Sequence, residues 1–493
     1  MVKLAIKERK NLHIWFLIAI FALVYGVASI RQHLLFETMG WDLAVFDQGV
    51  WQYSQFKFPY SSFHDLPWLA DHFHLILVSL APFYWFWPDA RVLLVAQAVI
   101  ISLGALPLYL LAKKVTKNHF FSLVVALGYF LYYSLQWHMF SGFHELTFLP
   151  LTFGGVLYFW ETRSSKFYWL FFILSVLVKE EIGLLLAAFG IWAFFNDKKR
   201  IRQAILTVVL GLIATFGLIY LVMPQIGGQP YRHLGYGRSG ETPIAVAENL
   251  IANPLFLVKA FTDSPVKIKT VFANFWPWGF LPLLAPTTLI LAFQQYAIRF
   301  LDYVKVIRWT PYFAYSLPLA TITAWGSIYG FKNLQKILNK KLADFLSYFL
   351  IILIVFQQYV LHAPLNSIFK KSFYRSEQWM LDNHKVFSCI PDRASLSAQN
   401  SLAGWLSQRE QIDIFPEGLR AGYEYVVLDL HQGQSENSFY FLGHENTHFL
   451  AEDLVAKGFY EVVCQEGNAL VLKKIKNLPP EITYPFELEI YEN

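Results

Sequence analysis

The chain has 493 residues, of which 56% are hydrophobic, 18% aromatic and only 15% charged, and its mean hydropathy is +0.39. Soluble domains average about 25% charged residues, so this composition excludes an ordinary soluble protein. The net charge of +5 is modest, and cationic cytoplasmic loops explain it, so we expect no nucleic-acid binding.

Long apolar runs recur along the chain and predict a polytopic α-helical membrane domain over residues 1–369. Hydropathy predicts about eleven spans. The first, residues 12–30, is too long for a signal-peptide core and follows several basic residues. We therefore expect an anchor with a cytoplasmic N-terminus, in an integral protein of the plasma (inner) membrane.

Two long outer segments, at about residues 31–90 and 224–274, are predicted between spans. Within the first, the apolar piece 75–87 is too short to cross a bilayer and ends at Pro88, which predicts a membrane-surface or re-entrant helix. The second is rich in glycine, and such a loop is able to move or to order around a ligand.

Prolines at positions 277, 282 and 286 break residues 275–300 into two half-spans, or a span plus a re-entrant piece. From about residue 370 the pattern changes. Alternating runs at 423–430 and 460–475 predict strands, and residues 372–384 and 448–457 predict helices, so residues 370–493 are expected to form a small extracytoplasmic α/β domain. Cys389 and Cys464 lie in it, and their spacing alone leaves their pairing open.

Ionisable side chains near the outer boundary of a membrane are costly unless paired, so they are functional candidates. The predicted topology brings several clusters to that one face, and their convergence is the argument for a site there. The candidates are Asp42 with Asp47; Asp71 with His72 and His74; His144 with Glu145; Lys179 with Glu180 and Glu181; and Arg232.

Each candidate also has a structural interpretation. Asp42 precedes a helix expected over residues 43–54 and suits its N-cap, although its carboxylate is equally suited to a substrate. Asp42 and Asp47 lie about 140° apart on a helix and cannot face one ligand, so Asp47 is either a substrate-binding residue or a buried structural one. His72 and His74 face opposite ways and make a poor zinc pair.

Glu145 suits a helix start, where the macrodipole favours an acid, and Lys179 with its two neighbouring acids suits a turn with a local ion pair. A lysine at the interface also suits a phosphate or pyrophosphate head group.

Several motifs carry a family resemblance: WDLAVFDQGVWQ, DHFHLILVSLAPFYWFWP, LPLYLLAKK, FHELTFLPL, VLVKEE, FWPWGFLPLLAP and ASLSAQNSLAGWLSQR. With them the chain resembles the domain-of-unknown-function 2079 family of predicted membrane proteins, which is similar to the C-type (GT-C) glycosyltransferases. The resemblance implies a catalytic acid at Asp42 and a second at Glu145, with a divalent metal, Mg or Mn, between them. Where such families have a His-Tyr pair before a late span, this chain has Arg308 to Tyr312, a departure from the pattern.

We therefore expect a membrane glycosyltransferase that uses a polyprenyl-phosphate-linked sugar for cell-envelope glycoconjugates, by a single inverting displacement that the resemblance implies. Asp42 would be the general base, with Glu145 and a metal, or Lys179 and Arg232, neutralising the departing phosphate. Residues 75–87 would form part of a groove for the lipid tail. The alternatives are a transporter or lipid-handling membrane protein, which the proline-broken helices favour, and a scaffold that binds an envelope partner through its C-terminal domain.

Overall fold

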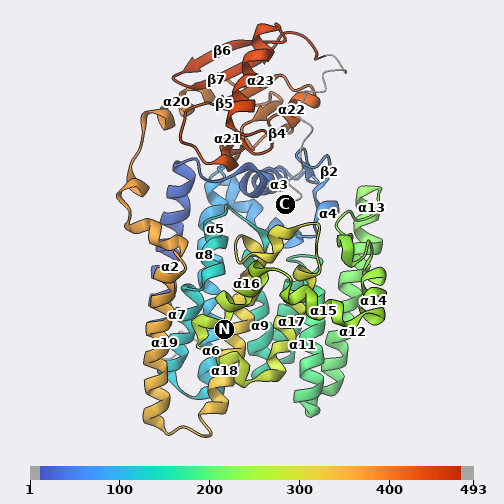
Figure 1. The fold of residues 1–493 in the computed structure, drawn as a ribbon, viewed down its shortest axis with the longest axis vertical. Helices are drawn as coiled ribbons and strands as arrows, with labels where there is room; N and C mark the ends of the chain where they lie inside the picture. Colours follow the sequence, from blue (N-terminus) through green and yellow to red (C-terminus); the bar gives the residue numbers. More distant parts are fainter. Residues whose placement is uncertain (1–10, 479–493) are drawn as a thin grey trace.

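The structure, a computed structural model, describes residues 11–478. A bundle of long helices forms the lower part of the molecule in Figure 1, and a small unit of strands and helices lies on its upper end. Residues of the first outer segment lie between these two parts, which places them where a site can draw side chains from both.

The helices of the bundle come from both halves of the chain and enclose one large apolar core. They are α2 (Leu12–Leu34), α5 (Arg91–Leu103), α6 (Ala105–Thr116), α7 (His119–Phe130), α8 (Tyr133–Met139), α9 (Leu149–Glu161), α10 (Ser165–Val176), α11 (Ile182–Asn196), α12 (Ile201–Gly217), α17 (Leu289–Phe300), α18 (Leu317–Leu334) and α19 (Lys340–Val360).

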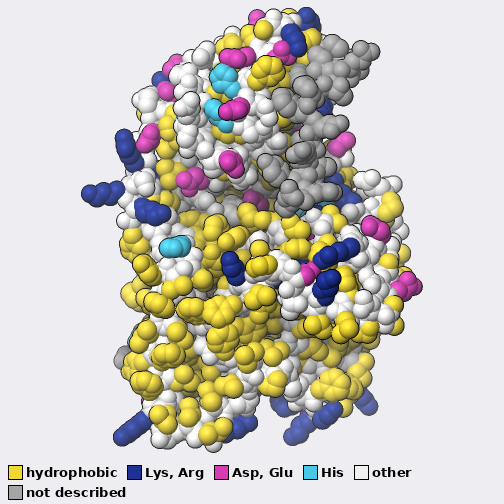
Figure 2. Space-filling view, in the orientation of Figure 1, with side chains coloured by type: hydrophobic (Ala, Val, Ile, Leu, Met, Phe, Trp, Pro, Cys, Tyr) yellow, Lys and Arg dark blue, Asp and Glu magenta, His cyan; other side chains and the backbone are white. Residues whose placement is uncertain are grey.

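The outer surface of this bundle is apolar, and Figure 2 shows it as a broad yellow belt with Lys and Arg side chains below it. Large side chains such as Leu23, Ile213 and Ile352 are 60% or more exposed there. A soluble protein rarely exposes so wide an apolar surface, whereas lipid tails cover it at no cost.

By length and hydropathy, four stretches within residues 11–478 are able to span a membrane, and six if each of two bent pairs is one span. The four are Leu12–Leu34, Arg91–Thr116, Lys198–Gly227 and Lys340–Val360. The bent pairs are α7 with α8, and α14 (Pro243–Ala252) with α15 (Pro254–Thr262). The expectation of about eleven spans also counted shorter helices such as α10 and α11, and it stays a prediction.

The first outer segment folds into short elements, not one long helix. They are a π-helical turn η2 (Gly40–Ala44), α3 (Val45–Ser54), the hairpin strands β1 (Tyr60–Ser61) and β2 (Leu66–Pro67), α4 (Trp68–Asp71) and a 3₁₀ helix η3 (Leu75–Trp85). The expected short apolar helix at 75–87 is therefore present as η3, with Val78, Phe83 and Trp85 exposed.

The second outer segment, expected to be a glycine-rich loop, is largely helical: a glycine-rich loop separates the short helix at its start from three helices that follow. Its elements are α13 (Met223–Gly227), α14 (Pro243–Ala252), α15 (Pro254–Thr262) and α16 (Pro265–Phe275), each of the last three with proline in its first turn. The prolines beyond it do break the chain as predicted, because three 3₁₀ turns, η8 (Trp276–Trp278), η9 (Leu281–Leu284) and η10 (Pro286–Thr288), lie between α16 and α17.

The C-terminal unit is a five-stranded sheet in the order β4-β3-β5-β7-β6, with helices packed against it. Strands β3, β4 and β5 are parallel, and β7 pairs antiparallel with β5 and β6. The elements are α20 (Gln378–Phe387), β3 (Leu396–Ala398), α21 (Asn400–Leu406), β4 (Ile412–Ile414), α22 (Glu417–Arg420), β5 (Tyr425–Asp429), α23 (His444–Ala456), β6 (Tyr460–Glu466) and β7 (Ala469–Lys474). Cys389 and Cys464 form a disulfide.

The two parts of the molecule share an apolar core. Phe36, Ala44, Val45 and Phe63 from the first outer segment pack with residues of β3, β4, β5 and α21 in one buried cluster. Gly40 lies so close to α21 that a Cβ there would be 2.9 Å from the Cβ of Ala403. The turn that carries Asp42 is therefore fixed by the C-terminal unit above it.

Candidate functional site

Asp42 lies inside the π-helical turn η2, and it is not an N-cap. The helix starts earlier than the sequence predicted, with Met39 in the cap position, and Asp42 lies in its first turn. Within residues 11–478 its carboxylate makes no hydrogen bond or ion pair. Burial raises the pKa of Asp42 to about 7, and the nearby Glu145 carboxylate adds to the increase.

Asp42 lines a chamber of about 770 Å³ between the bundle and the C-terminal unit. A second pocket of about 290 Å³ lies on the bundle side of it. The two cavities share five lining residues: His72, His144, His233, Lys305 and Tyr315. We call them the upper chamber and the lower pocket. They form one composite site at the outer end of the bundle.

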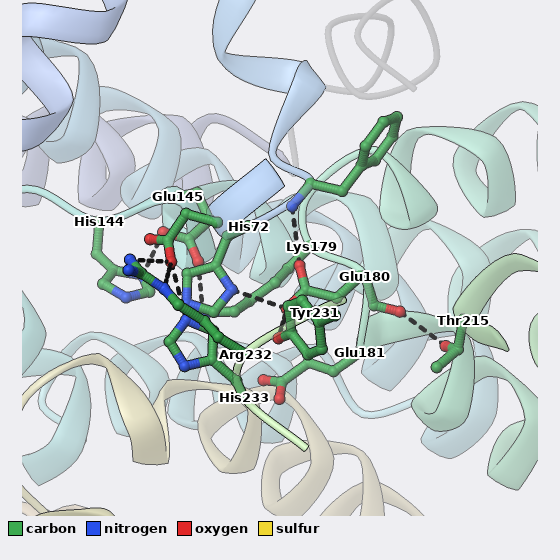
Figure 3. Close-up of polar contacts among 12 residues, drawn as sticks. His72, His144, Glu145, Lys179, Glu180, Glu181, Thr215, Tyr231, Arg232 and His233 are labelled. Atoms are coloured by element: carbon green, nitrogen blue, oxygen red, sulfur yellow. Dashed lines mark hydrogen bonds and ion pairs between the residues drawn. The ribbon is translucent and has the colours of Figure 1, made fainter. Parts of the chain in front are cut away.

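Glu145 is fully buried between two partners from different elements (Figure 3). Its Oε1 lies 2.8 Å from Nζ of Lys179, and its Oε2 lies 2.9 Å from Nδ1 of His144. Burial alone would raise the pKa of Glu145, but the adjacent His144 and Lys179 hold it well below its usual range. Glu145 is therefore an ionised partner of Lys179, and the two residues tie the loop before α9 to the turn before α11.

Glu180 joins the first outer segment to the second. Its Oε1 is 2.8 Å from Nδ1 of His72 and accepts a 2.7 Å hydrogen bond from the Tyr231 hydroxyl, while its Oε2 accepts from the backbone N–H of Phe73 (Figure 3). Burial would raise the pKa of Glu180, but the adjacent His72, with Lys179 and the Tyr231 hydroxyl, holds it well below its usual range. The predicted polar turn at residues 179–181 thus connects the two outer segments through the buried side chain of Glu180.

Asp71 makes a second junction between the same segments. Its Oδ1 accepts hydrogen bonds from Nε and Nη2 of Arg232, at 2.9 and 2.6 Å, and lies 2.9 Å from Nε2 of His233. His64 lies 3.3 Å from its other oxygen. Burial would raise the pKa of Asp71, but the nearby His72, with His233 and His64, holds it well below its usual range. Asp71 and Arg232 form a charge pair whose geometry fixes the glycine-rich loop.

Positive charge in the lower pocket comes from Lys179, Lys305 and Arg308. Nζ of Lys305 lies 2.9 Å from Nδ1 of His233, and Arg308 pairs with Asp302 at 2.9 Å and with Glu181 at 3.4 Å. The rest of the wall is largely apolar, and it includes Phe216, which is 40% exposed on the surface of α12. The pocket thus combines cations at one end with an apolar side next to the outer surface of the bundle.

Two of the predicted site residues, Asp47 and His74, are buried and held by contacts with other side chains of the protein. Asp47 is buried and lines neither cavity: it accepts hydrogen bonds from Tyr84, Ser407 and Gln408, so it links η3 to the C-terminal unit. His74 is 2% exposed and packs on Trp68 with ring centres 4.1 Å apart. Burial lowers the pKa of His74 to about 4, so it is neutral at pH 7.

The donor set between Asp42 and Glu145 is poor for a divalent cation, because both oxygens of Glu145 are already held by Lys179 and His144. Among the described residues, Asp71, His72 and His233 do offer three ligand atoms within 4.8 Å of one another. Asp71 is however already neutralised by Arg232. The expected metal stays a prediction.

The expected lipid-tail groove is in a different place from the site. Residues of η3 and α5, among them Leu80, Phe83 and Val99, line an apolar groove of about 340 Å³. None of residues 75–87 lines the lower pocket or the upper chamber. The apolar wall next to the cations comes from α11, α12 and α17.

Sequence reasoning missed several residues of the site. His64 belongs to the same aromatic-rich stretch as Asp71, and Lys305 and Arg308 lie in a short polar break between two apolar segments, a signal that could have identified them. Asn400, Asn437, Tyr440 and Phe441 reach the upper chamber from the C-terminal unit. Nothing in their local sequence indicates this.

Three comparisons place the chain among known proteins. No curated protein matches it. Among solved structures, the crystal structure of ArnT from Cupriavidus metallidurans bound to undecaprenyl phosphate is similar, with a TM-score of 0.52, 11% identity and coverage of 93% of this chain and 97% of that chain. At this identity the similarity shows the fold alone: the chain and that structure share one overall arrangement over nearly their whole lengths. The family described as predicted membrane protein (DUF2079) matches residues 32–471. The chain therefore belongs to the DUF2079 family of membrane proteins.

Proposed function

We propose that this protein is a membrane glycosyltransferase that transfers a sugar from a polyprenyl-phosphate carrier to an acceptor hydroxyl for cell-envelope glycoconjugates. The observation that carries the proposal is Asp42, a carboxylate without a partner in the described chain, in a chamber that adjoins a cationic, partly apolar pocket. A GT-C fold and a neighbour bound to undecaprenyl phosphate support the same substrate class.

The lower pocket has the chemistry that a polyprenyl phosphate requires. Lys305 and Arg308 offer positive charge to a phosphate, and Lys179 contributes from beside Glu145. The apolar side chains Leu184, Phe216 and Ile219 offer a surface for the first isoprene units, and Phe216 leads to the bundle surface that lipid would cover. The carrier would thus enter sideways from the bilayer with its phosphate toward the shared histidines.

Asp42 would serve as the general base in the upper chamber. It takes the proton of the acceptor hydroxyl as that oxygen forms a bond to the anomeric carbon of the sugar. The bond between the anomeric carbon and the phosphate oxygen breaks, and its electron pair leaves with the carrier as polyprenyl phosphate. The cations of the lower pocket stabilise this departing charge, and no step depends on a metal.

The proposed reaction occurs on the extracytoplasmic face. The connections α11–α12 and α18–α19 are rich in Lys and Arg and lie at the lower end in Figure 1, opposite the C-terminal unit. Positively charged loops remain in the cytoplasm, and a disulfide between Cys389 and Cys464 suits an oxidising compartment. Both arguments support an outer location for the composite site, and we propose the inner membrane as the membrane that holds it.

Purified protein in lipid nanodiscs, supplied with radiolabelled sugars on undecaprenyl phosphate and with extracted envelope glycolipids as acceptors, tests the proposal. We expect transfer by the natural protein and a loss of at least about 100-fold in Asp42→Asn. A matched control is Asp65→Asn. Asp65 belongs to the same outer segment as Asp42, but its carboxylate lines neither cavity.

Equal transfer by Asp42→Asn would remove the general base from the proposal. Binding of undecaprenyl phosphate without transfer of any labelled sugar would favour a lipid-handling protein instead, and vesicle flux assays with the same lipid would then test transport.

A further inference from the structure

The C-terminal unit forms one wall of the upper chamber, and the described side chains that it contributes to this wall are uncharged. The side chains that it contributes are Asn400, Asn437, Tyr440 and Phe441, so within the described residues this wall consists of amides and aromatic rings. Trp41, next to Asp42, faces the same space, and its ring centre lies 6.4 Å from that of Tyr440 and 5.8 Å from that of Phe441.

Two polar groups of this wall have no hydrogen bond within the described chain. They are the side-chain amide of Asn437 and the hydroxyl of Tyr440, and both residues are exposed. An amide offers a donor and an acceptor together, and a phenol offers the same in one atom. Hydroxyl groups of a ligand are able to use both without introducing charge.

The wall is held at a fixed position above Asp42. The Asn400 side chain accepts a 2.9 Å hydrogen bond from the backbone N–H of Gly40 and donates a 2.8 Å bond to the carbonyl of Asn437. Asn400 thereby connects the turn that carries Asp42 to the loop that carries Asn437 and Tyr440. A ligand held by that loop presents its groups to Asp42 at a defined distance.

We propose that the upper chamber binds the acceptor as an uncharged saccharide, with Tyr440 and Asn437 as its specificity-determining contacts and Asn400 as a positioning residue. This inference rests on the proposed glycosyl transfer and adds the acceptor class. Apolar faces of sugar rings pack on aromatic rings such as Trp41 and Tyr440, and ring hydroxyls pair with amides. The two substrates enter from different phases: the charged lipid from the bilayer side and the neutral sugar from the aqueous side.

Saturation-transfer NMR on the full-length protein in nanodiscs tests the acceptor class with defined probes. The probes are maltotriose and chitotriose as neutral saccharides, trigalacturonate as an anionic one, and a Ser/Thr-rich peptide. We expect a neutral trisaccharide to bind, and Tyr440→Ala and Asn437→Ala each to weaken its binding by about tenfold. Phe449→Ala is the matched control, because Phe449 is 59% exposed on α23 and lines neither cavity.

Undecaprenyl-phosphate binding to the same variants, measured by native mass spectrometry, separates the two proposals. Unchanged lipid binding with weaker saccharide binding supports the acceptor subsite. Three results would overturn the acceptor proposal. They are unchanged saccharide binding in both variants, no binding of either neutral trisaccharide at millimolar concentration, and preferential binding of the peptide or of trigalacturonate. If the natural protein binds a neutral saccharide but neither binds undecaprenyl phosphate nor transfers a sugar, the glycosyltransferase proposal is overturned instead.

Discussion

Charge compensation distinguishes the ionisable residues of this site from one another. Glu145, Glu180 and Asp71 each lie within 3 Å of a cation or a histidine from another segment, so these contacts hold loops together. Asp42 is the exception, with a pKa raised to about 7. A carboxylate kept without partners beside a cavity has a proton to exchange, which is the property that a general base needs.

The pH dependence of transfer follows from that pKa. In the proposed mechanism the ionised form of Asp42 is the active one, so we expect the initial rate to rise as pH increases through about 7 and to level off above it. Initial rates with saturating lipid donor, measured across this range, provide the check. In Asp42→Glu, any residual activity should show a shifted midpoint. A rate that is flat, or that falls as pH rises through 7, would contradict the assignment.

The Glu145–Lys179 pair predicts a stability effect. Both side chains are less than 10% exposed, so replacing one leaves the other as an uncompensated buried charge. We expect Glu145→Gln and Lys179→Met each to reduce the free energy of unfolding by about 3 kcal/mol. The double variant should lose less than the sum of the two. Unfolding in mixed micelles of increasing denaturing-detergent fraction measures this, and strictly additive losses would mean that the pair contributes nothing as a pair.

At the scale of elements, the packing of η2 against α21 is what orients the candidate base. A Cβ added to Gly40 would lie 2.9 Å from Ala403, one added to Gly404 would lie 3.3 Å from Leu43, and Asp47 accepts a hydrogen bond from Ser407 just beyond α21. Since one rigid contact surface joins the two parts, a small disturbance there should change activity without changing membrane insertion.

Gly40→Ala tests this packing. The new Cβ would lie 2.4 Å from Ile414 Cδ1 and 2.9 Å from Ala403 Cβ, so α21 must move away at a cost of about 1–3 kcal/mol. We expect reduced transfer and faster proteolysis of the C-terminal unit. Gly217→Ala is the control, because its Cβ would meet nothing within 4 Å on α12. If both variants behave like the natural protein, the docking of α21 does not position Asp42.

At the scale of the whole molecule, charge and apolarity are arranged along one axis. The apolar belt lies between a cationic lower end and the C-terminal unit, where acidic side chains are frequent (Figure 2). The upper chamber lies above the belt and the lower pocket borders it. The proposed transfer needs such an arrangement, because its donor would come from the bilayer and the saccharide of its acceptor from the aqueous side.

Thiol labelling tests the orientation, since the two native cysteines are joined to each other. Phe449→Cys on α23 and Lys199→Cys in the α11–α12 connection each introduce one exposed thiol. In intact cells we expect a membrane-impermeant maleimide to label position 449, and to label position 199 only after permeabilisation. The reverse pattern would place the composite site in the cytoplasm.

The sequence by itself determined that the chain is a membrane protein, where its prolines break it, which family it belongs to and which ionisable residues gather on one face. These properties depend on hydropathy and local residue spacing, which can be determined from the sequence without knowing how its segments pack. The tertiary structure decided that Asp42 lies inside a turn and not at a cap, and that Asp47 is held by Ser407, 360 residues away. It also decided that Lys305 and Tyr440 reach the upper chamber that Asp42 lines, and that Arg308 reaches the lower pocket beside it. Such partners meet only because distant segments pack together, and no local pattern records which segments will do so.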